Sequence, residues 1–158
     1  MKVVLSLFLI LCLWTYCNGQ TIYVPNTSWV TNIPANTILI AGSDYSQNYT
    51  NSININVTGT NWTISVQKDG LLWDSRLKIF ASRLGSGTFI DRFGISVPSL
   101  NVSGGIIPIE IPSNSSTVFF NGSFTANNIP IQYEIRGVSV LIPAGNYSTT
   151  VYYTISGN

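Results

Sequence analysis

Short runs in which apolar and polar residues alternate are the feature of this 158-residue chain that most constrains its fold. Period-two alternation places every second side chain on one face of a strand, whereas an amphipathic helix requires a period near 3.6. About nine or ten such runs follow one another, typically at intervals of roughly eight to twelve residues, which is typical of a β-sandwich. We therefore predict an all-β chain that forms a single β-sandwich of jelly-roll or immunoglobulin-like type.

Two pairs of these runs look like β-hairpins. Ser52–Thr58 and Asn61–Gln67 are separated only by Gly59-Thr60, and Thr117–Ala126 contains the turn dipeptide Asn121-Gly122. Short connections of this kind favour pairing of the two strands that they join. The residues predicted to face inward in the first pair are Ile53, Ile55, Val57, Trp62, Ile64 and Val66.

The same criteria assign the rest of the chain. Strands are expected at 37–41, 77–81 and 129–136, and a strand pair or extended run at 89–97; 106–111 is expected to be an edge strand because Pro108 lacks a ladder donor. The polar segment 45–51 is expected to be a loop.

The N-terminus has the pattern of a secretory signal. A positive residue, Lys2, precedes an apolar run at residues 3–13, and small residues precede a cleavage site after Gly19. A lipoprotein signal that retains Cys17 is the alternative. The domains are then 1–19 (signal), 20–35 (an extended N-terminal arm) and 36–158 (the β-sandwich). No later apolar run is long enough to span a bilayer, so we expect a secreted, extracellular protein.

The charge content excludes several functions. Only 8% of residues are charged, histidine is absent, and without Lys2 the basic and acidic residues balance at six each. A nucleic-acid surface needs a basic stripe, and most catalytic and metal sites use histidine, cysteine or clustered acids. The acids are scattered, and both cysteines lie in the signal. We therefore expect no enzyme, no cofactor and no metal.

N-glycans are the expected source of solubility in so uncharged a chain. The sequence contains eight Asn-x-Ser/Thr sequons, although a chain this rich in Asn, Ser and Thr also produces sequons by chance. Amides and hydroxyls in place of carboxylates would also suit an acidic medium. The sequon residues are Asn26, Asn48, Asn56, Asn61, Asn101, Asn114, Asn121 and Asn146.

The C-terminus carries a resemblance. Val138–Ile142 alternates, Pro143–Asn146 is a turn tetrad, and Tyr147–Ile155 resumes a strand pattern of the form T-V-x-Y-T-I. This predicted hairpin resembles the ends of spore-coat-U-type fimbrial subunits and of WxL-type cell-wall-binding domains. With the signal, the sequons and the low charge, the whole chain resembles a pilin-like surface filament subunit of the archaeal thread type.

The resemblance implies a homopolymer of identical subunits joined by donor strands, serving adhesion or biofilm formation. The donated segment would lie in the N-terminal arm, with Ile22, Val24 and Trp29 entering the neighbouring subunit, although Pro25 interrupts this segment. The alternative is that the arm is an ordinary first strand folded onto its own domain. Isopeptide crosslinks would draw their amine from Lys68 or Lys78, although a solvated surface position is the ordinary alternative for both lysines.

A secreted carbohydrate-binding module is the alternative function. Sugars stack on exposed aromatic rings, and the candidate residues are Trp29, Trp62, Trp73, Tyr152 and Tyr153. Trp62 lies on an aliphatic face and is the one expected to be in the core.

Overall fold

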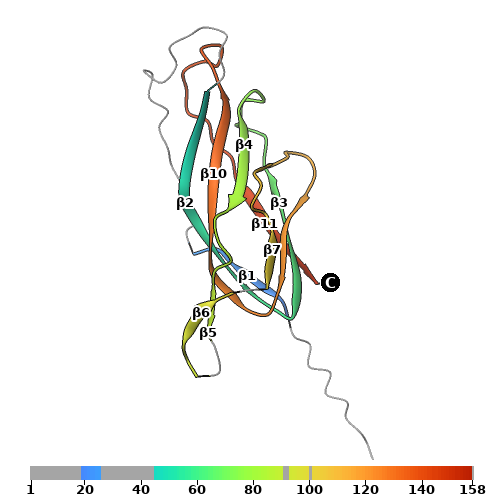
Figure 1. Cartoon of the computed structure of the whole chain (residues 1–158). Helices are drawn as coiled ribbons and strands as arrows, with labels where there is room; N and C mark the ends of the chain where they lie inside the picture. The colour runs from blue at the N-terminus through green and yellow to red at the C-terminus, as the bar shows by residue number, and fades with distance from the viewer. Residues whose placement is uncertain (1–18, 26–44, 91–92, 100, 158) are drawn as a thin grey trace, which may run out of the picture.

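The protein is a two-layered β-sandwich, which confirms the predicted all-β fold class (Figure 1). The computed structural model describes residues 19–25, 45–90, 93–99 and 101–157, and these contain eleven strands and no helix. Sheet A has the order β1 (Thr21–Tyr23), β2 (Tyr45–Thr58), β10 (Ala126–Val138), β4 (Lys78–Arg83), β8 (Ile109–Glu110), and also includes β5 (Thr88–Ile90) and β6 (Ser96–Pro98). Sheet B has the order β11 (Val151–Gly157), β3 (Asn61–Lys68), β9 (Thr117–Ser123), β7 (Val102–Gly104).

The core lies between the two sheets and is made by the residues that alternation predicts. All six predicted inward residues of β2 and β3 are buried, with Ile55, Trp62, Ile64 and Val66 fully excluded from solvent. Each such side chain contributes about 1.5–3 kcal/mol of hydrophobic stabilisation. The Trp62 ring meets Phe120 edge-on, and its indole N–H donates to the Phe124 carbonyl oxygen at 2.8 Å.

The predicted hairpin between β2 and β3 is wrong, because the two strands belong to different sheets. β2 pairs with β1 and β10, whereas β3 pairs with β9 and β11. Gly59-Thr60 therefore crosses from sheet A to sheet B. The alternation remains correct, since both inward faces point into the same core from opposite sides.

The predicted turn at Asn121-Gly122 is also wrong. β9 continues through this dipeptide, and the chain turns instead near Phe124, whose φ is +61°. The glycine serves packing, because a Cβ on Gly122 would lie 2.5 Å from the Trp62 ring. β9 and β10 then enter opposite sheets, as β2 and β3 do.

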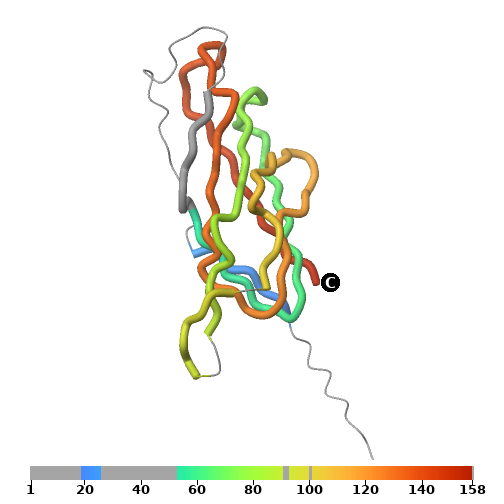
Figure 2. Tube along the Cα trace, viewed as in Figure 1, coloured from blue at the N-terminus to red at the C-terminus, as the bar shows by residue number. Residues whose placement is uncertain are grey.

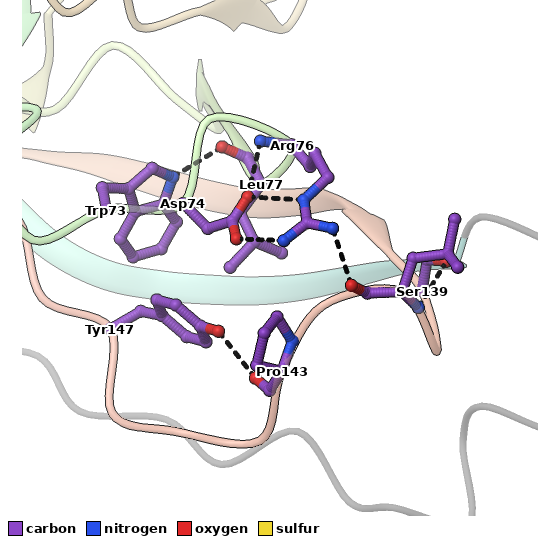
Figure 3. Close-up of polar contacts among 8 residues, drawn as sticks. Trp73, Asp74, Arg76, Leu77, Ser139, Pro143 and Tyr147 are labelled. Carbon is purple, nitrogen blue, oxygen red and sulfur yellow. Dashed lines mark hydrogen bonds and ion pairs between the residues drawn. The ribbon is translucent and has the colours of Figure 1, made fainter.

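The predicted C-terminal hairpin does not form. β10 ends at Val138, and residues 139–150 contain no strand; they cross to sheet B, where β11 pairs with β3. Hydrogen bonds hold this crossing segment: Arg76 Nη1 donates to the Leu141 carbonyl oxygen at 2.6 Å, and the Tyr147 hydroxyl donates to the Pro143 carbonyl oxygen at 2.6 Å (Figure 3). The predicted alternation is correct within β11, where Val151, Tyr153 and Ile155 pack on the core.

Of the remaining secondary-structure expectations, one is wrong, several are confirmed and some lie outside the described residues. Segment 45–51 is not a loop but the first half of β2, because the 13-residue β10 pairs along it as far as Tyr45. The strands expected near 77–81 and 129–136 are confirmed by β4 and β10, and the expected edge strand by β8. The pair within 89–97 is the β5–β6 hairpin, which projects from one end of the sandwich (Figure 2). The signal and the strand at 37–41 lie outside the described residues.

Candidate functional site

One side of the sandwich, formed by β1, β2 and β11, leaves strand edges without partners among the described residues. We call it the open side. β1 pairs Thr21–Tyr23 with Asn56–Thr58, which is three of the fourteen residues of β2. β11 is the first strand of sheet B, and among the described strands it pairs only with β3. Unpaired backbone N–H and C=O groups on an edge are a template for another strand.

Apolar side chains on the open side are only partly covered. Ile22, Val24, Val151, Tyr153 and Ile155 pack against the core but keep partial exposure. An incoming strand could bury this remaining area while its backbone pairs with the free edge. The open side thus combines the two requirements for strand addition.

A pair of tyrosines bridges the two sheets here. The hydroxyl groups of Tyr133 on β10 and Tyr153 on β11 are 2.7 Å apart. Burial raises the pKa of Tyr133 to about 12, and burial together with the neighbouring Tyr133 raises the pKa of Tyr153 well above its ordinary value. Both residues lie on faces that alternation marks as inward, but only the fold brings them together.

The predicted donor residues lie in or beside β1 of the same chain. Ile22 is opposite Val57, Val24 packs on the core just after the strand, and the Gln20 side-chain amide donates to the Asn61 carbonyl oxygen. Trp29 lies outside the described residues. Donation of this segment to a second copy stays a prediction, and it would require β1 to leave its place on β2.

The two candidate isopeptide lysines differ in environment. Lys68 is 5% exposed, and its Nζ donates to the Ile111 carbonyl oxygen at 2.7 Å. Burial lowers the pKa of Lys68, the charge of Glu110 opposes this shift, and that of Lys78 adds to it. Lys78 lies on the surface and pairs with Glu110 at 3.3 Å. A crosslink from either amine stays a prediction.

A cleft of about 940 Å³ lies beside Lys68 and is lined in part by Leu71, Trp73, Glu110 and Tyr152. Trp73 and Tyr152 are thus brought to one site. The Trp73 indole N–H already donates to the Leu77 carbonyl oxygen at 2.5 Å, so its polar group serves the fold (Figure 3). Tyr152 is 47% exposed and available to a ligand.

The other carbohydrate candidates are less accessible. Trp62 is fully buried, which confirms its expected place in the core. Tyr153 packs on the core, and Trp29 lies outside the described residues. The cleft therefore retains two of the five candidate rings.

Most sequon residues with described side chains lie on the surface. Asn56 is partly buried, and its Oδ1 accepts the backbone N–H of Asn128 at 2.7 Å. Asn48 lies in β2, and Asn26 is outside the described residues. The exposed sequon residues are Asn61, Asn101, Asn114, Asn121 and Asn146.

Acidic side chains are engaged by neighbouring basic residues at three places. Arg76 binds Asp74 at 2.6 Å and Arg136 binds Glu134 at 2.7 Å, in addition to the Lys78–Glu110 pair. Within the ranges that the structure describes, no three His, Cys, Asp or Glu side chains gather in a way that could hold a metal ion. The same ranges contain no helix with the length and apolar character of a membrane span.

Arg83 is a buried group that the sequence did not single out. It is 4% exposed, and its guanidinium donates to the carbonyl oxygens of Gly85, Val102 and Gly104 and to the Ser86 hydroxyl. Because β4 carries Arg83 and β7 carries Gly104, these bonds join the two sheets. Only its position among largely apolar neighbours in β4 hinted at burial.

Comparison with protein-family models, with curated proteins and with solved structures found no match to this chain.

Proposed function

We propose that this chain is a structural subunit of a secreted, glycosylated cell-surface filament, in which copies join head to tail by donor-strand complementation. The observation that supports this function is the open side: β1 covers three residues of a fourteen-residue strand, and five apolar side chains beside it stay partly exposed. A head-to-tail contact does not close on itself, so it grows into a fibre. Such a fibre would serve adhesion or biofilm formation.

Exchange of β1 between copies would reproduce the same contacts in a second molecule. In one chain, Ile22 faces Val57 and the Gln20 amide reaches Asn61. If β1 of the next copy took this place, the local pairing would be unchanged. The edges of β2 and β11 that have no partner within the described ranges would offer additional pairing. The small net charge would also keep repulsion between copies low.

A disulfide across the β1–β2 pair tests the exchange. The Cα atoms of directly opposed residues in an antiparallel pair lie about 4.5–5.5 Å apart, a separation that suits a disulfide. We therefore design Ile22→Cys with Val57→Cys in a chain that begins at Gln20, which has no other cysteine. Monomer oxidised before assembly should form no fibres in negative-stain microscopy, and reduction should restore them.

Assembly before oxidation gives the complementary result. Fibres formed under reduction and then oxidised should give a ladder of covalent multimers on a non-reducing denaturing gel, because each β1 would face the Val57→Cys site of its neighbour. Phe89→Cys with Val97→Cys, an opposed pair in the β5–β6 hairpin, is the matched control and should assemble in both redox states. Fibres from the pre-oxidised Ile22–Val57 variant would refute β1 exchange.

Carbohydrate binding at the Lys68 cleft is the second candidate. It is favoured by the half-exposed Tyr152 ring beside Trp73 in a cleft that also offers Glu110 and Asn114. A glycan array probed with monomer should then show binding that Tyr152→Ala abolishes, with Thr154→Ala as a control on the same exposed face. A silent array would leave only the structural function.

A further inference from the structure

Three of the sequons lie in register on adjacent strands of sheet B. Asn61-Trp62-Thr63 begins β3, Asn121-Gly122-Ser123 ends β9, and Asn101-Val102-Ser103 runs into β7. The register pairs Asn61 with Ser123, Trp62 with Gly122 and Thr63 with Asn121. On the other side of β9, Gly122 pairs with Val102 and Asn121 with Ser103. We call these nine residues the sequon block.

The block has one inward-facing row and two outward-facing rows. Its middle row is Trp62, Gly122 and Val102, and Trp62 and Val102 are buried. The Cβ that Gly122 lacks would point at the Trp62 ring, 2.5 Å away. All three asparagines lie on the outer face and are exposed.

We infer that Asn61, Asn101 and Asn121 carry one glycan cluster on the outer face of sheet B, and that Asn61 and Asn121 are glycosylated only before β3 and β9 pair. This inference rests on the glycosylation in the proposed function. In the reaction, the asparagine amide nitrogen bonds to the anomeric carbon of a lipid-phosphate-linked oligosaccharide. The bond from that carbon to the phosphate oxygen breaks, the lipid phosphate leaves, and an amide proton is released to solvent.

The folded block resists this reaction. A transferase must bind the asparagine and the hydroxyl two residues later in one extended segment, and that segment must first leave its sheet. β3 is bonded on both sides by β11 and β9, and β9 by β3 and β7. Freeing β3 would also expose Trp62, a fully buried ring. Opening of interior strands approaches the free energy of global unfolding, so it is rare in the native state. In addition, the Ser103 hydroxyl donates to Asn121 Oδ1.

Two other sequons provide an internal control. Asn114 and Asn146 are exposed and lie outside the strands, between β8 and β9 and between β10 and β11. Their glycosylation requires no strand to leave a sheet. Loop and strand sequons of the same chain should therefore respond differently to folding.

The cluster also has a consequence for assembly. Asn61 and Asn101 flank Ser123 in one row, so they lie about 10 Å apart across two strand spacings, with Asn121 in the next row. Three glycans within this area would cover that end of the outer face of sheet B. Copies would then have to meet through strand edges, as the proposed function requires, instead of stacking sheet B on sheet B.

The test uses unglycosylated chain from Gln20 onward, an oligosaccharyltransferase and its lipid-linked donor, with occupancy at each site measured by mass spectrometry. In the folded chain we expect Asn61 and Asn121 to have at least about tenfold lower occupancy than Asn114 and Asn146, because interior strands rarely open. In Ile64→Asp, which places a charge at a fully buried position and prevents folding, the difference should vanish. Peptides cut from the chain after Lys and Arg are a second unfolded substrate.

The outcomes are distinct. Equal occupancy of strand and loop sequons in the folded chain would overturn the ordering of glycosylation before folding. If Asn61 and Asn121 stayed unglycosylated in the peptides while Asn114 was glycosylated, the cluster itself would be overturned. If no site were modified in any substrate, glycosylation and the cluster would both be refuted, whereas filament assembly, read by microscopy, would be unaffected.

Discussion

The two long sides of the sandwich are closed in different ways. On the side where β4 approaches β7, which we call the sealed side, the Arg83 guanidinium donates to three carbonyl oxygens and a hydroxyl, and the Arg83 backbone N–H donates to the Gly105 carbonyl oxygen at 2.6 Å. On the open side, the two sheets are joined by the hydrogen bond between the Tyr133 and Tyr153 hydroxyls and by the Gln20 side-chain amide, which donates to the Asn61 carbonyl oxygen. Apolar side chains there stay partly exposed.

The two sides of this weakly charged chain differ in the polar groups that join the sheets. The sealed side uses a buried cation whose guanidinium N–H groups all find neutral acceptors, so the two sheets cannot separate there without breaking many bonds. The open side has strand edges without partners among the described residues, together with apolar side chains that stay partly exposed. We therefore interpret the sealed side as a permanent seam, and the proposed function makes the open side the site of association; both interpretations can be tested.

The largest effect is expected on the sealed side. Arg83→Met should lower the free energy of unfolding by about 3 kcal/mol, because several partly or fully buried carbonyl oxygens lose donors at once. Urea denaturation followed by tryptophan fluorescence measures this change. Lys78→Met, on the same strand but exposed, is the matched control and should change stability by under about 0.5 kcal/mol. Similar values for the two variants would contradict the seam.

Alkaline pH should weaken the tyrosine link on the open side. The pKa of Tyr133 is raised from 10.0 to about 12 by burial. A raised pKa means that stability is fully present below pH 10 and is lost as pH rises through 12, in total about 2 kcal/mol at pH 12. The free energy of unfolding measured between pH 8 and pH 12 should show this loss. Tyr133→Phe should be less sensitive over that range, and Tyr152→Phe should retain the dependence.

A smaller loss of stability is expected at β1. Ile22→Ser removes a partly buried side chain and should cost about 1 kcal/mol. Tyr23→Ser, on the same strand but 63% exposed, should cost less. If β1 is the donor, Ile22→Ser should also lower fibre yield, measured by sedimentation, more than Tyr23→Ser. Equal fibre yields from the two variants would contradict a role of β1 in assembly.

The smallest effect is expected at the loop beside β4, where Asp74 accepts hydrogen bonds from Arg76 (Figure 3). These bonds lower the pKa of Asp74 from 3.8 to about 2. A lowered pKa means that the stabilisation is present above pH 3.8 and is lost as pH falls through 2. The free energy of unfolding of Asp74→Asn should therefore differ from that of the native chain at pH 5, and the two values should converge below pH 2. A constant difference would assign the effect to packing.

Much of the fold is predictable from single strands. The inward residues of β2, β3 and β10 follow from alternation, and Pro108 correctly marks the neighbouring β8 as an edge. The candidate site is less predictable. The sequence predicts Ile22 and Val24 as donor residues. It does not predict the Tyr133–Tyr153 link, the Arg83 seam or the register of the sequon block, because these join residues that are distant in the chain.

The alternating pattern alone determined an all-β chain and the face to which most side chains point, because the side-chain direction in a strand depends only on local backbone geometry. Tertiary structure decided which strands pair. Gly59-Thr60 is compatible both with a hairpin, whose two apolar faces lie side by side, and with a crossing between sheets, whose apolar faces oppose each other. Periodicity is identical in the two cases, and burial of Trp62 against Phe120 and Gly122 from the neighbouring β9 belongs to the second.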